Sequence, residues 1–300
     1  MSPLRLGIML SCLATMLSAC GGGGGRSGTL PQTIPPQTIP STSTYFSMVA
    51  EVSAIRGASD SLLMTDVFLT HPGLPRGDRR QTFCGSGFCQ AYYDGYRLFG
   101  ISLLDFQLSD RMDDHQFFSS LRGIKMVDVR GRDEEAGVAT DFNTLGGWLN
   151  KSAFGVTVNS IVSGVSDGVG LRGTGFAVAY SLGDATGTTP AFGNATWTGT
   201  MVGGDTSLTA YRGNRIMGDA TLTFDLSQSD IDVTFTNIRD IDAGRPHGLI
   251  TWQNIPVTSG SFSRGFIGNS IDGRFYGPNH EEVGGIFERN QIAGSFGAKR

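Results

Sequence analysis

The chain has 300 residues, of which 39% are hydrophobic, and its formal net charge at pH 7 is −4. The hydrophobic content excludes wholesale disorder, and the net acidic charge argues against a nucleic-acid-binding protein. The 44 glycines, about twice the usual share of roughly 7%, show no three-residue period, which excludes a collagen-like chain and favours a glycine-rich β protein.

Residues 1–19 have the pattern of an export signal. Arg5 supplies a positive charge, and the apolar stretch Leu6–Met16 has a length within the usual ~7–15 residues. The sequence Leu-Ser-Ala-Cys20 then matches the lipobox of bacterial lipoproteins, in which the cysteine thiol takes a diacylglycerol before cleavage. We expect a signal peptide and a lipid anchor on Cys20, with an ordinary secretory signal as the alternative. Gly21, where an aspartate would oppose transport, favours the outer membrane.

Residues 20–44 have the composition of a tether. Gly21–Gly28 favours a flexible coil, and the repeated sequence of Leu30–Pro40 favours extended polyproline II. Such a segment would hold the folded part of the chain away from the lipid surface.

Cys84 and Cys89 form the only cysteine pair outside the signal and the anchor. The intervening Gly-Ser-Gly-Phe allows a tight loop, and an exported chain favours a disulfide that stabilises by roughly 2 kcal/mol. The alternative is half of a zinc site, for which His71 and His115 are the nearest further ligands.

Residues 45–144 predict a small strand-rich domain that precedes the C-terminal half. Leu63–Thr70 and Arg97–Leu108 are apolar with partial alternation and predict strands, whereas Met112–Lys125 fits a helix or a loop. His71–Arg80 predicts an exposed loop by its Pro and Gly content. Its arginines are the candidate ligand-binding residues: Arg76, Arg79 and Arg80. The variable loops near Asp240–His247 are the alternative place for a partner.

Residues 145–300 predict an antiparallel meander, because apolar and polar side chains alternate in successive short segments. Many antiparallel strands normally close or split to protect their edges, so we expect an eight-stranded up-and-down barrel, with a β-sandwich as the alternative. The expected strands are Gly147–Asn159, Leu171–Leu182, Asn194–Val202, Arg215–Leu226, Ile231–Ile238, Gly248–Val257, Ser270–Tyr276, Glu282–Arg289 and Gln291–Gly297.

The last thirty residues carry a resemblance to a known family. The run Gly273-Arg-Phe-Tyr-Gly-Pro-Asn-His-Glu-Glu-Val-Gly-Gly-Ile-Phe287 is followed by Gly-Ser-Phe296-Gly-Ala-Lys-Arg300. Together they resemble the closing strands of the transferrin-binding-protein-B-like β-barrel lipoproteins. The resemblance covers about half of the chain, and the last thirty residues are its specific part.

The resemblance implies an eight-stranded barrel displayed at the outer membrane, often preceded by a small handle domain. Members of this family capture a host protein such as transferrin and feed a membrane transporter, and relatives bind haemoglobin or a complement regulator. No ligand-binding residue can be carried over, because the matching motifs lie outside the variable loops. The matching Glu281, Glu282, Phe287 and Phe296 are expected to serve the fold.

Motifs for chemistry are weak in this sequence. Ser166 lies in a Gly-x-Ser-x-Gly pattern, but a strand is expected after it where a hydrolase needs a helix, so a hairpin loop fits better. His280 is followed by Glu-Glu but lacks the second histidine of a metalloprotease. Asp240 and Asp242 lack the distal glutamate of a calcium loop and predict a solvated turn. We expect no enzyme, cofactor or metal site.

The sequence and the resemblance together predict a lipoprotein anchored in the outer membrane at the cell surface. Its barrel would bind an extracellular ligand, such as an iron- or haem-carrying protein, and an outer-membrane transporter or export system would be a further partner. The alternative is a structural or accessory envelope lipoprotein that faces the periplasm and has no nutrient ligand.

Overall fold

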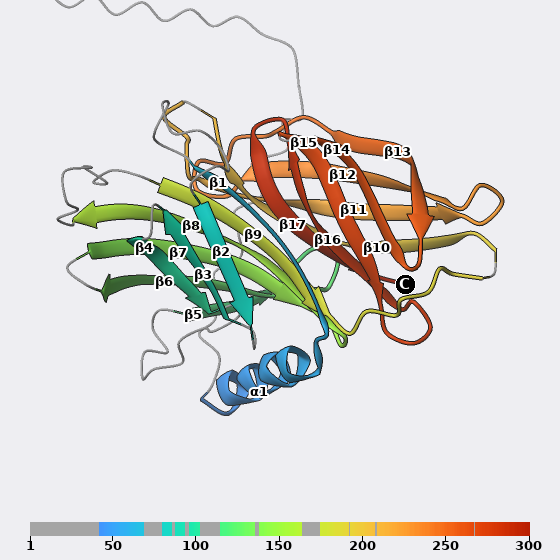
Figure 1. The fold of residues 1–300 in the computed structure, drawn as a ribbon, viewed down its shortest axis with the longest axis horizontal. Helices are drawn as coiled ribbons and strands as arrows, with labels where there is room; N and C mark the ends of the chain where they lie inside the picture. Colours follow the sequence, from blue (N-terminus) through green and yellow to red (C-terminus); the bar gives the residue numbers. More distant parts are fainter. Residues whose placement is uncertain are drawn as a thin grey trace, which may run out of the picture. The chain divides into compact units, whose positions relative to one another are not determined.

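Eight consecutive strands close into an antiparallel barrel, drawn in yellow to red in Figure 1. The computed structural model describes residues 42–68, 80–85, 88–93, 96–102, 115–135, 138–163, 175–191, 193–207, 209–266 and 268–300. The barrel strands are β10 (Ala195–Asp205), β11 (Arg215–Asp225), β12 (Asp230–Asp240), β13 (Ile250–Thr258), β14 (Ser261–Phe266), β15 (Asn269–Tyr276), β16 (Glu282–Arg289) and β17 (Ile292–Lys299). Pairing of β10 with β17, from Thr198↔Lys299 to Asp205↔Ile292, completes the ring, so the expected barrel is confirmed.

A six-stranded antiparallel sheet precedes the barrel in the chain, with the strand order β1-β9-β8-β7-β6-β5. Its strands are β1 (Ser61–Phe68), β5 (His115–Ser119), β6 (Lys125–Glu135), β7 (Val138–Trp148), β8 (Ser152–Ser163) and β9 (Gly175–Gly183). A separate three-stranded sheet contains β2 (Arg80–Gly85), β3 (Phe88–Tyr93) and β4 (Tyr96–Ser102). The expectation of strand-rich structure before the barrel is therefore confirmed as well.

The barrel begins at Ala195, later than the boundary expected at residue 145. The strands expected over 147–159 and 171–182 correspond to β8 and β9, but these two strands pair within the six-stranded sheet. The boundary was wrong because alternation reports only that one face of a strand is buried, and both sheets bury one face.

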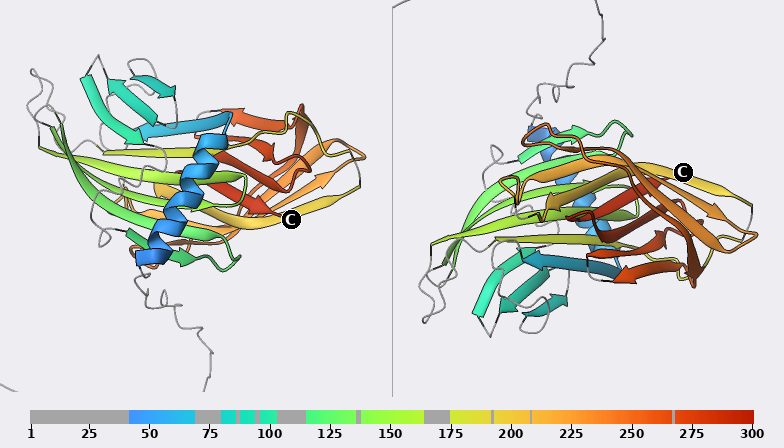
Figure 2. Two further views of the ribbon diagram at one scale, coloured as in Figure 1. Left: turned by 90° about the horizontal axis from the view of Figure 1, so that it is seen from below. Right: turned by 90° about the horizontal axis from the view of Figure 1, so that it is seen from above.

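One helix and one short strand also differ from the expectations. The helix α1 (Thr42–Ala58) lies where the tether was expected to pass into strands, and it crosses the six-stranded sheet (Figure 2). Its Glu51 accepts a hydrogen bond from the Trp148 indole at 3.1 Å and pairs with Lys125 at 2.5 Å, which fixes the helix on the sheet. The segment expected as helix or loop contains the strand β5 instead.

The inside of the barrel is filled by aromatic and branched side chains. Along β12 the residues Ile231, Val233 and Phe235 point inward and are buried, whereas the residues between them are partly exposed. Phe235 packs against the rings of Phe287 and Phe296, with centroids 4.8 and 5.4 Å apart. Both family-motif phenylalanines thus lie in the interior, as expected.

A second apolar cluster joins the outside of the barrel to the six-stranded sheet. Val202, Ile286 and Ala293 of the barrel share this buried cluster with Phe154 and Val156 of β8. Burial of such apolar side chains is the main contribution to the free energy that holds two packed sheets together. The sheet and the barrel therefore form one packed body.

Aromatic rings lie directly over glycines on the neighbouring strand at several places in both sheets. Phe262 is the register partner of Gly273, and Phe287 is the register partner of Gly294. A methyl group on either glycine would overlap the facing ring. These glycines give the rings space close to the backbone, which is a known way to stabilise a curved sheet.

Replacing Gly273 with alanine tests this arrangement. We expect Gly273→Ala to lower the free energy of unfolding by about 1–3 kcal/mol, because the new methyl group forces the Phe262 ring from its place. Urea denaturation followed by tryptophan fluorescence measures the change. Gly248→Ala is the matched control, since nothing lies within 4 Å of the position of its added methyl group. An equal loss in both variants would contradict the packing argument.

Candidate functional site

Exposed apolar side chains gather at one end of the barrel. Because the strands run antiparallel, the connections over residues 206–214, 241–249, 267–268 and 290–291 all lie at this end, which we call the loop end. Of the four large hydrophobic side chains that are exposed in the described part of the chain, three belong to it. They are Tyr211, Leu249 and Phe266, with exposed fractions of 39%, 60% and 72%.

Arg245 links the two long connections of the loop end, which are residues 206–214 and residues 241–249. Its guanidinium stacks on the Tyr211 ring, with 4.2 Å between the guanidinium carbon and the ring centroid, and it pairs with Asp205 at 2.5 Å. The nearby His247 has a lowered pKa, because it is partly buried and lies beside the positive charge of Arg245. Tyrosine and arginine are among the residue types that are enriched where binding energy concentrates at protein interfaces.

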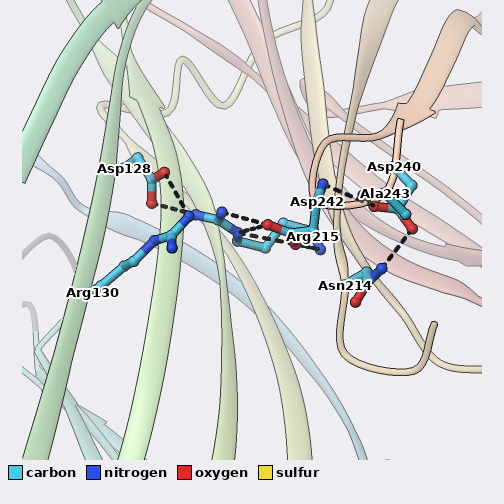
Figure 3. Close-up of polar contacts among 7 residues, drawn as sticks. All are labelled: Asp128, Arg130, Asn214, Arg215, Asp240, Asp242 and Ala243. Atoms are coloured by element: carbon cyan, nitrogen blue, oxygen red, sulfur yellow. Dashed lines mark hydrogen bonds and ion pairs between the residues drawn. The ribbon is translucent and has the colours of Figure 1, made fainter. Parts of the chain in front are cut away.

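Arg215 holds the loop end to the six-stranded sheet (Figure 3). The Arg215 side chain is 4% exposed, and its guanidinium pairs with Asp128 of β6 on one side and with Asp242 on the other side at 2.6 Å. Burial alone would lower the pKa of Arg215 and raise that of Asp242. Their hydrogen bonds and opposite charges outweigh burial, so the pKa of Arg215 is raised and that of Asp242 is lowered.

Asp240 organises the connection that carries Arg245. Its carboxylate accepts hydrogen bonds from the backbone N–H groups of Asp242 at 2.9 Å and Ala243 at 2.8 Å. It also accepts one from the side-chain amide of Asn214 at 2.8 Å, which ties the connection over 241–249 to the one over 206–214. The expectation of a solvated turn was wrong for Asp240, whose side chain is fully buried.

Glu282 makes a second link between the barrel and the six-stranded sheet. Its carboxylate accepts hydrogen bonds from the backbone N–H groups of Asn150 and Lys151 and from the Ser152 hydroxyl, at 2.7 to 3.1 Å. Burial raises the pKa of Glu282 despite these bonds. Its neighbour Glu281 accepts hydrogen bonds from Asn279, so both glutamates of the family motif serve the fold as expected.

The residues singled out from the sequence are largely outside this site. Cys20, Arg76, Arg79 and Ser166 lie outside the described residues, and Arg80 begins β2 with a side chain that is not described.

Cys84 and Cys89 lie directly opposite each other in the β2–β3 hairpin, a backbone register that suits the expected disulfide, which stays a prediction. In the described residues, no group of three or more His, Cys, Asp or Glu side chains is placed to hold a metal ion.

Sequence reasoning missed the apolar residues of the loop end and the Arg215 network. A large apolar residue isolated among polar loop residues, as at Leu249, is a signal that could have been used. Nothing in the sequence pairs Arg215 with Asp128, because the two residues meet only after two separate sheets have formed.

Replacing Arg215 tests whether this network holds the site. We expect Arg215→Met to lower the free energy of unfolding by about 3–5 kcal/mol, because it leaves Asp128 and Asp242 without the buried cation that they share. Because the pKa of Asp242 is lowered, its stabilising contribution is present above about pH 4 and is lost as the pH falls through the lowered value. Denaturation at pH 7 and at pH 3 should therefore show a smaller difference from the wild type at pH 3.

Arg130→Met is the matched control for this experiment. Arg130 also pairs with Asp128, but its side chain is 64% exposed and the pair is 3.8 Å long, so we expect a change of less than about 1 kcal/mol. Equal effects of the two substitutions would show that burial of Arg215 is not what gives the network its strength.

Comparison with known proteins gives one match to a protein family and several structural likenesses. No curated protein sequence matches this chain. A double mutant of transferrin-binding protein B from Haemophilus parasuis has a TM-score of 0.34 and 15% identity, over 57% of this chain and 36% of that one. Transferrin-binding protein B from Neisseria meningitidis has a TM-score of 0.36 and 18% identity, over 80% and 42%. The N-lobe of lactoferrin-binding protein B from Moraxella bovis has a TM-score of 0.30 and 15% identity, over 59% and 80%.

Likenesses of this size carry no conclusion about function, and the chain spans less than half the length of the first two proteins. No helix among the described residues combines the length and apolar character needed to cross a bilayer. The family match is specific to the barrel: residues 189–300 match the model of the C-lobe and N-lobe beta barrels of Tf-binding protein B. Over these residues the eight-stranded barrel of this chain is therefore similar to the β-barrels of transferrin-binding protein B.

Proposed function

We propose that this protein is a surface lipoprotein of the outer membrane that binds an extracellular protein through the loop end of its barrel. The observation that carries the proposal is the grouping of Tyr211, Leu249 and Phe266 at one end of a barrel of this kind. Exposed apolar residues that gather at one place on a folded protein commonly mark a site for a partner. Apolar and aromatic side chains of this kind support binding of a partner rather than catalysis.

The rigidity of the loop end supports the same proposal. Asp240 fixes the backbone of the connection over 241–249, and Arg215 fixes that connection to the six-stranded sheet. A loop that is already ordered loses less conformational entropy when a partner binds, so more of the contact energy appears as affinity. Arg245 and Tyr211 are thus held in place before a ligand arrives.

The ligand class that we propose is an iron- or haem-carrying protein. The family model that matches the barrel is that of Tf-binding protein B, which motivates testing transferrin first. An outer-membrane transporter would then be a further partner, and the protein itself would need no cofactor.

The N-terminal part of the proposal concerns attachment. Residues 1–19 would be removed as a signal peptide, Cys20 would carry the acyl chains, and residues 20–44 would serve as the tether. Cys84 and Cys89 would form a disulfide in the oxidising compartment that follows export.

Labelling of intact cells tests the location. We expect an antibody raised against residues 195–300 to label intact cells, and Cys20→Ala to abolish membrane attachment because the acyl chains are lost. A mass spectrum of the mature protein should show acylated Cys20 as its first residue and two hydrogen masses fewer for the disulfide. Signal that needs permeabilised cells would overturn the surface location and favour an accessory role in the periplasm.

Substitution of the loop end tests the binding site. The probes are purified transferrin, lactoferrin and haemoglobin, measured by surface plasmon resonance on the full-length lipoprotein. We expect at least one to bind, and the combined variant Tyr211→Ala, Leu249→Ser, Phe266→Ser to weaken that binding by about tenfold or more, because central apolar and aromatic anchors are lost.

Leu121→Ser is the matched control, because Leu121 is as exposed as Phe266 but lies in the turn between β5 and β6. Full binding by the triple variant would move the site away from the loop end. Failure of all three probes would overturn the proposed ligand class.

A further inference from the structure

The barrel has an incomplete seam between β13 and β14. These two strands are both fully described, and they pair at Val257↔Phe262 and Thr258↔Ser261 next to their turn and at no further position. On its other side β14 pairs along its whole length with β15, as far as Phe266↔Asn269. We call the edge of β13 over residues 250–256, where it has separated from β14, the open edge.

Two residues of unusual backbone conformation explain why the strands separate. If the register continued, Asn254 of β13 would face Gly265 of β14, and both have positive φ angles, of 53° and 108°. Few residues other than glycine and asparagine adopt such angles, and they bend a strand away from its regular course. A methyl group on Gly265 would overlap the backbone oxygen of Asn269, so only glycine allows β14 to lie this close to the start of β15.

Arginine side chains occupy the open edge in place of a strand. The Arg264 guanidinium donates hydrogen bonds to the backbone carbonyls of Gln253 and Asn254, and the Arg289 guanidinium donates to the carbonyl of Thr251 at 2.5 Å. In a complete sheet, backbone N–H groups of the next strand fill this role. Neither arginine forms an ion pair with a carboxylate of the described residues, so both retain unused positive charge.

Three buried polar atoms at the same end of the barrel also have no partner, and one of them is the Nε atom of Arg245. Trp252 of β13 is 4% exposed, and its indole N–H donates no hydrogen bond, although Arg289 stacks on the ring at 4.9 Å. The side-chain oxygen of Asn269, at the start of β15, accepts none. Buried polar groups are almost always paired, so these atoms leave hydrogen-bonding capacity unused at the end of the barrel where the seam opens.

We propose that the open edge of β13 receives an extended, acidic segment of a partner protein as an added strand. Backbone N–H groups of that segment would take over the carbonyls that the arginines now hold, and its carboxylates would pair with the released Arg264 and Arg289. Exchange of one hydrogen-bond donor for another is nearly neutral, whereas the new ion pairs are charge-assisted and favourable. Leu249 before β13 and Phe266 at the end of β14 flank the edge and offer contacts to apolar side chains.

This inference adds a mode of binding to the proposed function. It depends on the proposed function only in assuming that the partner is a protein. Strand addition to an exposed sheet edge is a general mode of peptide recognition, in which the backbone gives affinity and alternate side chains give specificity. The competing interpretation is that the arginines simply protect the edge from unwanted pairing, since charged side chains often do so. The two interpretations predict opposite effects when Arg264 is removed.

Binding of synthetic peptides to the full-length protein tests the proposal. The probe is an array of fluorescent nonapeptides that alternate glutamate with valine, isoleucine, threonine or tyrosine, measured by polarisation. We expect acidic peptides to bind, their lysine counterparts to fail, and methylation of alternate backbone nitrogens to weaken the best peptide about tenfold or more. Arg264→Ala should also weaken it, and Arg130→Ala, at an exposed arginine of the other sheet, should not.

Three results would overturn the proposal: no acidic peptide binds, binding is insensitive to backbone methylation, or Arg264→Ala strengthens binding as a protective role requires. The methylated peptide keeps the test valid even if Arg264→Ala fails to fold. Capture of a protein ligand that Arg264→Ala leaves unchanged would overturn strand addition while the proposed function stands. Peptide binding without capture of any tested protein would leave strand addition standing and overturn the proposed ligand class.

Discussion

One buried guanidinium determines how the candidate site is built. Arg215 starts a barrel strand, yet its charge is shared between Asp128 of the six-stranded sheet and Asp242 of a barrel connection. A buried cation requires such partners, because leaving it unpaired in a poorly solvated place is expensive. The same contact therefore fixes the connection that presents Arg245 and sets that connection against the sheet. The ordered conformation of the loop end therefore depends on Arg215, which is buried and is not itself available to a ligand.

The barrel has a tightly packed interior, but the pairing between β13 and β14 is incomplete. Inside, rings such as Phe262 and Phe287 lie over glycines of the neighbouring strand, so the interior tolerates little change in volume. At the seam, by contrast, Asn254 and Gly265 break the pairing and side chains replace a strand. Closure of the remaining pairs is what allows one pair of strands to separate without loss of the fold.

The amino-acid sequence allowed the barrel to be predicted, but it did not allow the candidate site to be predicted. Alternation along residues such as Ile231, Val233 and Phe235 records burial of one face, which is a local property and is readable from one strand. Assignment of β8 and β9 to the correct sheet depends on pairing between distant segments, which alternation does not encode. The same limit hid the Arg215 network and made Asp240 look solvated. The exposed Leu249 and Phe266 could have been noticed, but only the topology places them at one end.

Ring closure has a consequence for how this chain folds. The first barrel strand, β10, finds one of its two partners only in the last, β17, so that contact joins segments separated by nearly the whole barrel sequence. Contacts of such long sequence separation slow folding, because loop-closure entropy is lost before the contact compensates for it. Until β17 docks, the edges of β10 and β16 both remain unpaired and can pair with other chains. Protection of those edges while the chain folds is therefore a requirement of this topology.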